Sequence, residues 1–474
     1  MDDDDRMGAF DAVMWGIEED PILRSVIVAV VALEGAPHRD GFRQRVERLT
    51  RVVPQLRQRV IGNPVSLVPP RWETVRDFDL DYHLRWASLP PEENDMTGVL
   101  GIAERAAEQD FDRDRPLWEM TVVTGVDAGE GPTAAAVVVK LHHAITDGVG
   151  GMMLAATLFD LTPEGADLGP MPDAPEPKPS LDPLQRLSSG LDYQVSETRS
   201  ALGDAWSGGL GAARRTLADP VGSAAAAAAF TLSASRLLAP ASTPMSPIMT
   251  ERSMAVRCAI IELPLGGLKS AAHSVGGTLN DAFMAVVSRG VGRYHAEMGS
   301  PVDAVRVNMP VNMRGGDSAP VRGNSWVPAR FALPVTGETP RDTMRALHPV
   351  LLAAREEPAL PVSKVVYRLL STLPNPVAAG IAGGLMKGTD VAATNVPGPP
   401  FPVYVAGAKA TSIVPFAPKG GASLNIGLMS YDGTAYLGLT IDPAAVTDPD
   451  LMVACVAEAA AEVVAAGEEA PATP

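Results

Sequence analysis

A β-branched run that leads into two adjacent histidines and then into glycine constrains the fold of this chain more than any other stretch. Residues 137–141 read Val-Val-Val-Lys-Leu, and His142 and His143 follow directly. An Asp-Gly pair and two further glycines then precede an apolar segment at residues 152–161. The pattern predicts a strand that ends at the histidines, a glycine-rich turn and a helix.

The two imidazoles are not expected to share one role, because consecutive side chains of extended backbone point to opposite sides. One ring should face the core or the turn, and the other should face an opening in the protein. A neutral imidazole has an unperturbed pKa of about 6.5 and can take a proton from a hydroxyl group near neutral pH.

A histidine pair at the end of a strand is more often structural than catalytic, and three features shift the balance here. Asp147 follows His143 by four residues, close enough to fix the turn. Gly148, Gly150 and Gly151 indicate positive φ angles or close approach of another group to the backbone. The rest of the sequence offers no competing chemical constellation. A metal site fits poorly, because adjacent histidines rarely ligate one ion and no His, Cys or Asp cluster completes the shell.

Residues 142–148, His-His-Ala-Ile-Thr-Asp-Gly, match the HHxxxDG signature of the acyl-CoA-dependent acyltransferases with the chloramphenicol-acetyltransferase-like fold. Within that superfamily the chain resembles the bacterial wax ester synthase/diacylglycerol acyltransferase family. The resemblance implies an α/β fold with two chloramphenicol-acetyltransferase-like lobes. Each lobe would be a mixed β-sheet with helices, and an active-site tunnel would run between them.

The narrower resemblance depends on further segments that occur in the family's order from about Phe10 to Gly467. These segments are Pro70-Arg71-Trp72-Glu73, residues 78–84, Arg115-Pro116-Leu117-Trp118-Glu119, Asn280-Asp281, residues 305–314, Gly323-Asn324 and residues 394–399. The last, Thr-Asn-Val-Pro-Gly-Pro, is the most family-specific of the later pieces, and two prolines around a glycine predict a rigid loop. The chain departs from the family at residues 23–26, Leu-Arg-Ser-Val, where many members carry Met-His-Val before the first strand.

The resemblance also assigns a partner to the aspartate of the signature. In the wider superfamily an arginine at a place similar to that of Arg57 pairs with this aspartate. The resemblance therefore implies a salt bridge between Arg57 and Asp147. Asp147 would then be structural and not a triad partner of His143.

Two other motifs have a structural interpretation beside the functional one. Leu117 and Trp118 are large anchors at the start of a strand predicted over residues 118–124, and we expect them and Pro116 to pack near the active-site channel. Asn280 and Asp281 match family site residues. However, Thr278 followed three residues later by an acidic residue also fits a capping box at a helix start.

Composition divides the chain into three parts. Residues 163–183 are rich in proline, which is not tolerated inside helices or central strands. We expect an N-terminal acyltransferase lobe at residues 7–165, a Pro/Gly/Ala-rich linker or crossover with helices at 166–250, and a C-terminal acyltransferase lobe at 251–470. Within the last part, Asp432-Gly433 between two apolar runs predicts a β-hairpin.

The charge balance excludes one class of partner. The formal net charge of the 474 residues is -17, whereas a nucleic-acid-binding protein needs a basic face. An anionic ligand such as coenzyme A would need a local basic patch that works against this field.

Two cysteines give no disulfide framework, so a reducing cytoplasm is the default. The acidic N-terminus is unlike a secretory signal, and no apolar run reaches the roughly 20 residues that span a bilayer. Any contact with a membrane or lipid droplet is therefore expected to be peripheral.

The resemblance implies an O-acyltransferase that moves a long-chain acyl group from acyl-CoA to diacylglycerol or a fatty alcohol. His143 would act as the general base, His142 would support the turn, and Gly148 would let the tunnel pass close to the backbone. Acyl-CoA would be a substrate, and no cofactor or metal is implied. Two alternatives stay open: another HHxxxDG acyltransferase of the condensation or polyketide-associated type, and a catalytically silent lipid-surface binding protein.

Overall fold

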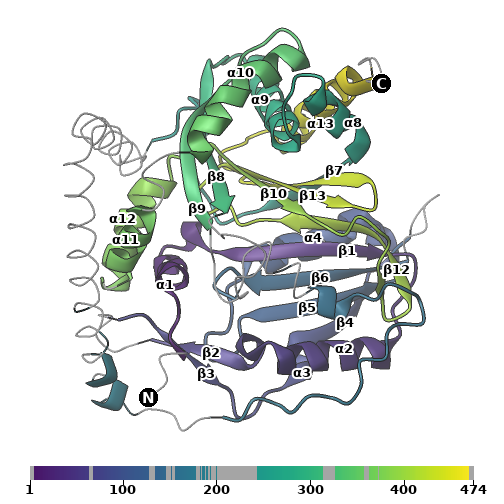
Figure 1. The fold of residues 1–474 in the computed structure, drawn as a ribbon, viewed down its shortest axis with the longest axis vertical. Helices are drawn as coiled ribbons and strands as arrows, with labels where there is room; N and C mark the ends of the chain where they lie inside the picture. Colours follow the sequence, from purple (N-terminus) through teal and green to yellow (C-terminus); the bar gives the residue numbers. More distant parts are fainter. Residues whose placement is uncertain are drawn as a thin grey trace, which may run out of the picture.

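Two six-stranded β-sheets lie next to each other in the described part of the chain, with helices on their outer sides (Figure 1). The structure is a computed structural model. It describes residues 5–62, 68–127, 134–145, 151, 155–177, isolated positions between 182 and 199, 243–312, 326–356, 362–371 and 373–468. The expected mixed α/β architecture of two sheet-containing lobes is confirmed.

The first sheet has the strand order β11-β12-β1-β6-β5-β4. Its strands are β1 (Val26–Leu33), β4 (Leu84–Ser88), β5 (Trp118–Thr124), β6 (Ala135–His142), β11 (Tyr404–Val405) and β12 (Ala408–Phe416). The valine-rich strands β1 and β6 lie in the middle and pair antiparallel, with Val26 opposite His142. The predicted strand that ends at the histidines is therefore a central strand of this sheet.

The second sheet has the order β7-β14-β13-β10-β8-β9. Its strands are β7 (Arg257–Pro264), β8 (Ala304–Asn312), β9 (Trp326–Pro334), β10 (Val391–Pro397), β13 (Leu424–Tyr431) and β14 (Thr434–Ile441). The predicted hairpin is confirmed as β13–β14, and the φ angles of Asp432 and Gly433 are both positive, at 43° and 84°. The rigid loop predicted from the two prolines around Gly398 starts after Pro397, and Gly398 and Pro399 lie outside the strands. Residues up to Pro397 belong to β10, which pairs parallel with β13, because tertiary pairing accommodates a proline at a strand end.

The helices form outer layers on both sheets (Figure 1). On the second sheet they are α8 (Leu265–His273), α9 (Leu279–Glu297), α10 (Pro340–Arg355) and α13 (Pro449–Glu468). On the first sheet they are α2 (Arg39–Val52), the short α3 (Leu80–His83) and α4 (Met96–Glu108). Helix α2 buries Phe42, Val46 and Leu49 on one face, so its arginines lie on the other face.

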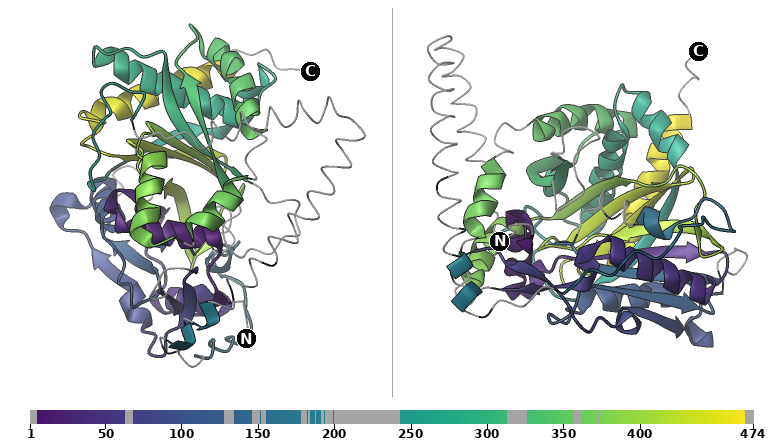
Figure 2. Two further views of the ribbon diagram at one scale, coloured as in Figure 1. Left: turned by 90° about the vertical axis from the view of Figure 1, so that its left-hand side faces the viewer. Right: turned by 60° about the horizontal axis from the view of Figure 1, so that its bottom comes forward.

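A third group of helices joins the N-terminal segment to the C-terminal half of the chain. Helix α1 (Ala9–Gly16) packs with α11 (Val362–Leu370) and α12 (Asn375–Met386) at one edge of the molecule (Figures 1 and 2). Their shared apolar cluster includes Ile17 and Leu23, both fully buried. Ile17 is the first residue of the 3-10 helix that follows α1, and Leu23 is the last residue of the next one. This cluster fixes the chain immediately before β1.

Strand β12 connects the two lobes physically. It comes from the C-terminal part of the sequence, yet it pairs antiparallel with β1 in the first sheet and also packs on β13 and β14 of the second. The three-part division at residues 7–165, 166–250 and 251–470 stays a prediction. The first sheet needs both parts of the chain, because β11 and β12 complete it, whereas all strands of the second sheet lie between residues 257 and 441.

Two glycines let β12 cross the second sheet closely. Gly427 and Gly438 face each other across β13 and β14. A Cβ atom on Gly438 would lie 1.9 Å from the carbonyl oxygen of Pro415 on β12, and one on Gly427 would lie 3.3 Å from it. The contact between the lobes therefore requires a residue without a side chain at position 438.

We expect Gly438→Ala to destabilise the protein by about 1–3 kcal/mol, because a methyl group there must push the β12 backbone away. Urea denaturation of the purified variant measures this loss. Gly266→Ala on α8 is the matched control, because a Cβ atom there meets nothing within 4 Å. A Gly438→Ala protein as stable as this control would show that the lobes are not held together at this crossing.

Candidate active site

The histidine turn is held by the two strands that flank β6. His142 donates its backbone N–H to the carbonyl of Leu117 (3.0 Å), at the start of β5. His143 donates its backbone N–H to the carbonyl of Ser25 (2.8 Å), immediately before β1. Ile145 closes the turn with a bond to the carbonyl of His142 (3.0 Å). The backbone of both histidines is therefore fixed from both sides.

The two imidazoles have different surroundings, as the alternation along the strand predicts. His142 is 0% exposed and meets the rings of Trp15 and Phe111 edge-on, at centroid distances of 5.5 and 6.1 Å. His143 is the first residue after β6 and is half-buried. The position of His142 suits structural support, and that of His143 leaves its ring the more accessible of the pair.

Sequence reasoning missed the residue that holds His142, which is Glu18. Its carboxylate is 2% exposed, and Oε1 lies 3.0 Å from His142 Nε2. The same oxygen accepts the backbone N–H of Ser25 at 2.7 Å. Burial raises the pKa of Glu18, but His142, the Ser25 bond and Arg113 together outweigh it and hold that pKa below its ordinary value. Nothing in the local sequence separates Glu18 from its acidic neighbours Glu19 and Asp20.

Asp147 and Gly148 lie outside the described residues, so their roles and the Arg57–Asp147 pair stay predictions. Arg57 itself is well engaged: Nη2 lies 2.6 Å from Glu47 Oε1 and Nε donates to Thr50 Oγ1 at 3.0 Å. Its guanidinium also lies 4.4 Å from the ring centroid of Phe78. These contacts tie the turn after α2 back onto that helix.

We expect Arg57→Ala to lower the free energy of unfolding by about 1–3 kcal/mol, through the lost charge-assisted hydrogen bonds. A double-mutant cycle with Glu47→Gln, measured by urea denaturation, identifies the partner. A coupling close to that of the whole Arg57→Ala loss assigns the effect to Glu47. A coupling near zero would show that another carboxylate, such as Asp147, carries the effect.

The Pro-Leu-Trp motif, residues 116–118, supports the histidine turn from the side of β5. All three residues are buried, the Leu117 carbonyl receives His142 N–H, and Trp118 Nε1 donates to the carbonyl of Leu56 at 2.8 Å. His83 stacks on the Trp118 ring at 4.7 Å and binds the Trp118 carbonyl through Nδ1. Burial lowers the pKa of His83 to about 4, so this ring is neutral and structural.

Asn280 and Asp281 lie at the start of α9 in the second lobe. The Asp281 carboxylate accepts both the backbone N–H (2.7 Å) and the hydroxyl (2.8 Å) of Thr278, which is the capping interaction that the sequence allows. It also lies 2.9 Å from His348 Nδ1 on α10. Asn280 Nδ2 contacts the sulfur of Met309 at 3.5 Å. Their assignment as family site residues stays a prediction.

A narrow cavity of ≈ 30 Å³ lies between the lobes, beside the strand partner of His142. It is lined by Arg24, Val26 and Glu108 from the first lobe, and by residues of the second lobe that include Lys419 and Thr440. Thr440 is buried, and its hydroxyl has no hydrogen-bond partner within the part of the chain that the structure describes. The gap is therefore lined by charged side chains of both signs and by one buried hydroxyl group.

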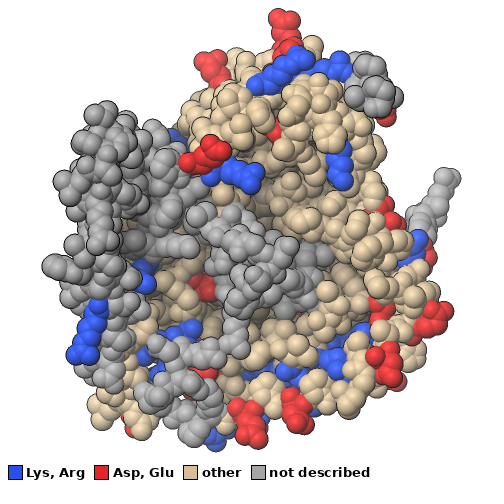
Figure 3. All heavy atoms as spheres, in the orientation of Figure 1, with Lys and Arg blue, Asp and Glu red and all other residues tan. Residues whose placement is uncertain are grey.

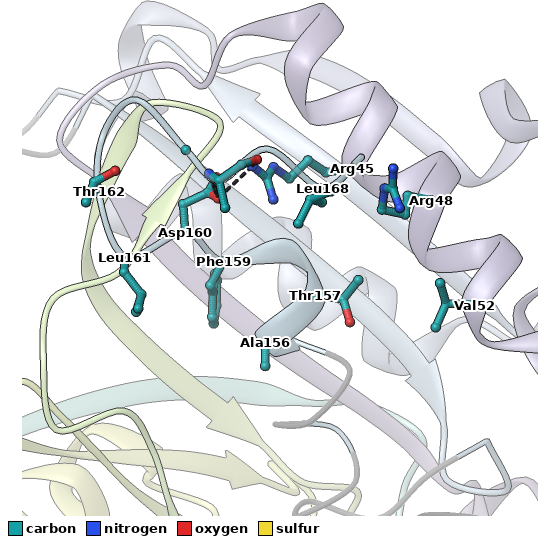
Figure 4. A pocket seen from close by; sticks show the side chains of 12 residues that line it. Arg45, Arg48, Val52, Ala156, Thr157, Phe159, Asp160, Leu161, Thr162 and Leu168 are labelled. Atoms are coloured by element: carbon teal, nitrogen blue, oxygen red, sulfur yellow. Dashed lines mark hydrogen bonds and ion pairs between the residues drawn. The ribbon is translucent and has the colours of Figure 1, made fainter. Parts of the chain in front are cut away.

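A more open hollow of ≈ 500 Å³ lies on the arginine face of α2 (Figure 4). Arg45 lies 2.6 Å from Asp160, and Arg48 donates to the carbonyls of Gly169 and Pro170. The proline-rich segment is thereby bound to α2, and residues 161–177 form no helix or strand. Figure 3 shows acidic side chains beside the basic ones along this helix.

Two kinds of feature are absent from the described residues. None of their helices is both long enough and apolar enough to cross a bilayer. No group of three or more His, Cys, Asp or Glu side chains within these residues could hold a metal ion.

Comparisons with known proteins agree with the geometry. The profile of the wax ester synthase/diacylglycerol acyltransferase catalytic domain matches residues 7–283, and that of the WS/DGAT C-terminal domain matches residues 322–463. A putative diacylglycerol O-acyltransferase of Mycobacterium tuberculosis is 33% identical over 470 residues, which cover 98% of this chain and 93% of the relative. A probable diacylglycerol O-acyltransferase of the same organism is 25% identical over 451 residues, covering 93% and 91%.

Solved structures show the same fold. The wax ester synthase/diacylglycerol acyltransferase of Marinobacter aquaeolei VT8 superposes with a TM-score of 0.62 at 18% identity, covering 98% of this chain and 100% of that chain. The first condensation domain of the calcium-dependent antibiotic synthetase superposes with a TM-score of 0.56 at 16% identity, covering 98% of each chain.

Proposed function

Since the chain belongs to the wax ester synthase/diacylglycerol acyltransferase family, we propose that it transfers a long-chain acyl group from acyl-CoA to a lipidic alcohol. The acceptor is diacylglycerol, a fatty alcohol or both, and the product is a triacylglycerol or a wax ester. The observation that supports this most is the divergence of the histidine pair: one imidazole is locked in the core, and the next lies half-buried at the end of the strand.

His143 acts as the general base in this proposal. Its ring takes the hydroxyl proton while the alcohol oxygen attacks the thioester carbonyl carbon. The tetrahedral intermediate then collapses, the C–S bond breaks, and the departing CoA thiolate receives the proton from the imidazolium. The proton ends on sulfur, the acyl group ends on the alcohol oxygen, and no acyl-enzyme forms.

The donor enters through the gap between the lobes. Val26, the strand partner of His142, lines this gap together with Arg24 and Lys419. Because the acceptors are lipids, the enzyme works in the cytoplasm at the surface of the inner membrane or of lipid droplets, without spanning the bilayer.

A side-by-side comparison of three acceptors tests the proposal. Purified protein receives labelled palmitoyl-CoA with diacylglycerol, hexadecanol or hexadecylamine in matched mixed micelles, and both labelled product and free thiol are measured. Release of CoA that depends on an alcohol supports the proposal, and the faster alcohol identifies the acceptor. Transfer to the amine alone would indicate condensation-type chemistry. Retention of lipid without acyl transfer would indicate a silent lipid-binding protein.

A further inference from the structure

Glu18 is a single carboxylate enclosed by the protein at a point where three segments meet. It lies in the 3-10 helix η2 (Ile17–Glu19), and the neighbouring Ile17 is anchored in the apolar cluster of α1, α11 and α12. Glu19, the next residue, is exposed. Burying a carboxylate costs free energy unless its oxygens are paired, so this position requires compensating partners.

The partners of Glu18 set both the tautomer and the orientation of His142. Nδ1 of His142 accepts the backbone N–H of Ala144 at 3.0 Å, so the ring proton is on Nε2 and faces Glu18 Oε1. Arg113 lies 3.7 Å from the other carboxylate oxygen and stacks on Trp15, whose ring meets His142 edge-on. The imidazole is therefore fixed at both nitrogens.

Two chains of polar contacts lead from Glu18 to the backbone on either side of the His143 ring. In one, Glu18 holds the N–H of Ser25, and the carbonyl of Ser25 receives the N–H of His143 at 2.8 Å. In the other, Glu18 holds the ring of His142, and that ring receives the N–H of Ala144. One buried carboxylate, that of Glu18, thus positions the backbone N–H groups of both His143 and Ala144.

We propose that Glu18 is a positioning residue for acyl transfer, which aims the His143 imidazole by fixing Ser25 and His142 at the two strand ends. This inference rests on the proposed function. Glu18 contacts neither substrate. It acts through the backbone of the turn. Substitution of Glu18 therefore displaces the His143 ring but leaves the binding of the substrates in place.

The test compares Glu18→Gln with the exposed neighbour variant Glu19→Gln. We expect kcat of Glu18→Gln to fall by about 10- to 100-fold, as for small displacements of a catalytic group, with KM for acyl-CoA within about twofold of wild type. His142→Asn keeps an acceptor for Ala144 N–H but lacks the Nε2 atom that lies 3.0 Å from Glu18, so we expect a similar loss of kcat. The double variant should lose no more than the larger single loss, because both act on one element.

Several results would overturn the proposal: a folded Glu18→Gln with wild-type kcat, a change confined to KM, or single losses that multiply in the double variant. If Glu18→Gln does not fold, His142→Asn decides the question. A fully active His142→Asn protein would show that the contact between Glu18 and the His142 ring does not position His143. NMR of ¹⁵N-labelled histidine provides a readout independent of turnover. The His143 ring signals should shift in Glu18→Gln and stay in place in Glu19→Gln. An inactive wild type would count against the proposed function, and this NMR comparison would still decide the role of Glu18.

Discussion

Replacing His143 with alanine should lower kcat by about 10²- to 10⁴-fold while the protein stays folded, because this is the range that a positioned general base contributes. The structure explains why folding should persist. The bond that His143 gives to Ser25 comes from its backbone N–H, which alanine keeps. The half-buried ring also belongs to a turn and not to one of the apolar cores. Turnover of labelled acyl-CoA with the preferred alcohol, at saturating concentrations of both, measures the loss.

His273→Ala is the matched control for this experiment, because that histidine is exposed on α8 and should leave kcat unchanged. Circular dichroism and a urea melt of each variant establish that the proteins compared are folded. A folded His143→Ala protein with wild-type turnover would remove this residue from the mechanism. The acceptor assay on the wild type would still show whether the family's reaction takes place.

Elements with a strong local pattern could be predicted from the sequence. Strand β5 has the bounds that its run of β-branched and large apolar residues indicates, and the Asp-Gly turn of β13–β14 follows from the need for positive φ angles. Helix α10 carries an apolar stripe at Met344, Leu347 and Leu351, so its signal was present although the helix was not predicted.

Features that depend on distant parts of the chain could not be predicted. The pairing of β12 with β1 joins the two ends of the sequence, and periodicity says nothing about which strand completes which sheet. Arg57 meets Glu47 because Pro54 begins a 3-10 turn that folds the chain back onto α2. Glu18 has the same local sequence signal as a solvated acidic residue. Its burial follows from the packing of α1 against α11 and α12.

Asp442 is a buried carboxylate on which we expect the stability of the folded protein to depend strongly. It lies beside the gap between the lobes. It is 0% exposed, Oδ2 accepts Lys419 Nζ at 2.9 Å, and the two carboxylate oxygens accept the hydroxyl and the backbone N–H of Ser253 at 2.6 and 2.7 Å. Lys419 also donates to the carbonyls of Ser253 and Ala255. Ser253 and Lys419 both line the interlobe cavity, so this cluster shapes the second lobe's side of the proposed donor path.

We expect Asp442→Asn to lower the free energy of unfolding by about 3–5 kcal/mol at neutral pH, because one partner of a buried pair is removed and Lys419 keeps its charge. Asp432→Asn is the control, since that residue is exposed in the hairpin turn and asparagine tolerates its positive φ. Replacing Lys419 by methionine as well should recover part of the loss.

The pH dependence of the same variant gives a second, independent test. Burial raises the pKa of Asp442, but the bonds from Ser253 and Lys419 outweigh it and hold that pKa below its ordinary 3.8. A lowered carboxyl pKa stabilises the folded state above the ordinary value, and this contribution disappears as pH falls through the lowered one. The difference between wild type and Asp442→Asn should therefore be largest at neutral pH and should shrink below about pH 4. Urea melts from pH 7 to pH 3 measure it, and a gap that stays constant over this range would show that the charge of Asp442 does not stabilise the junction.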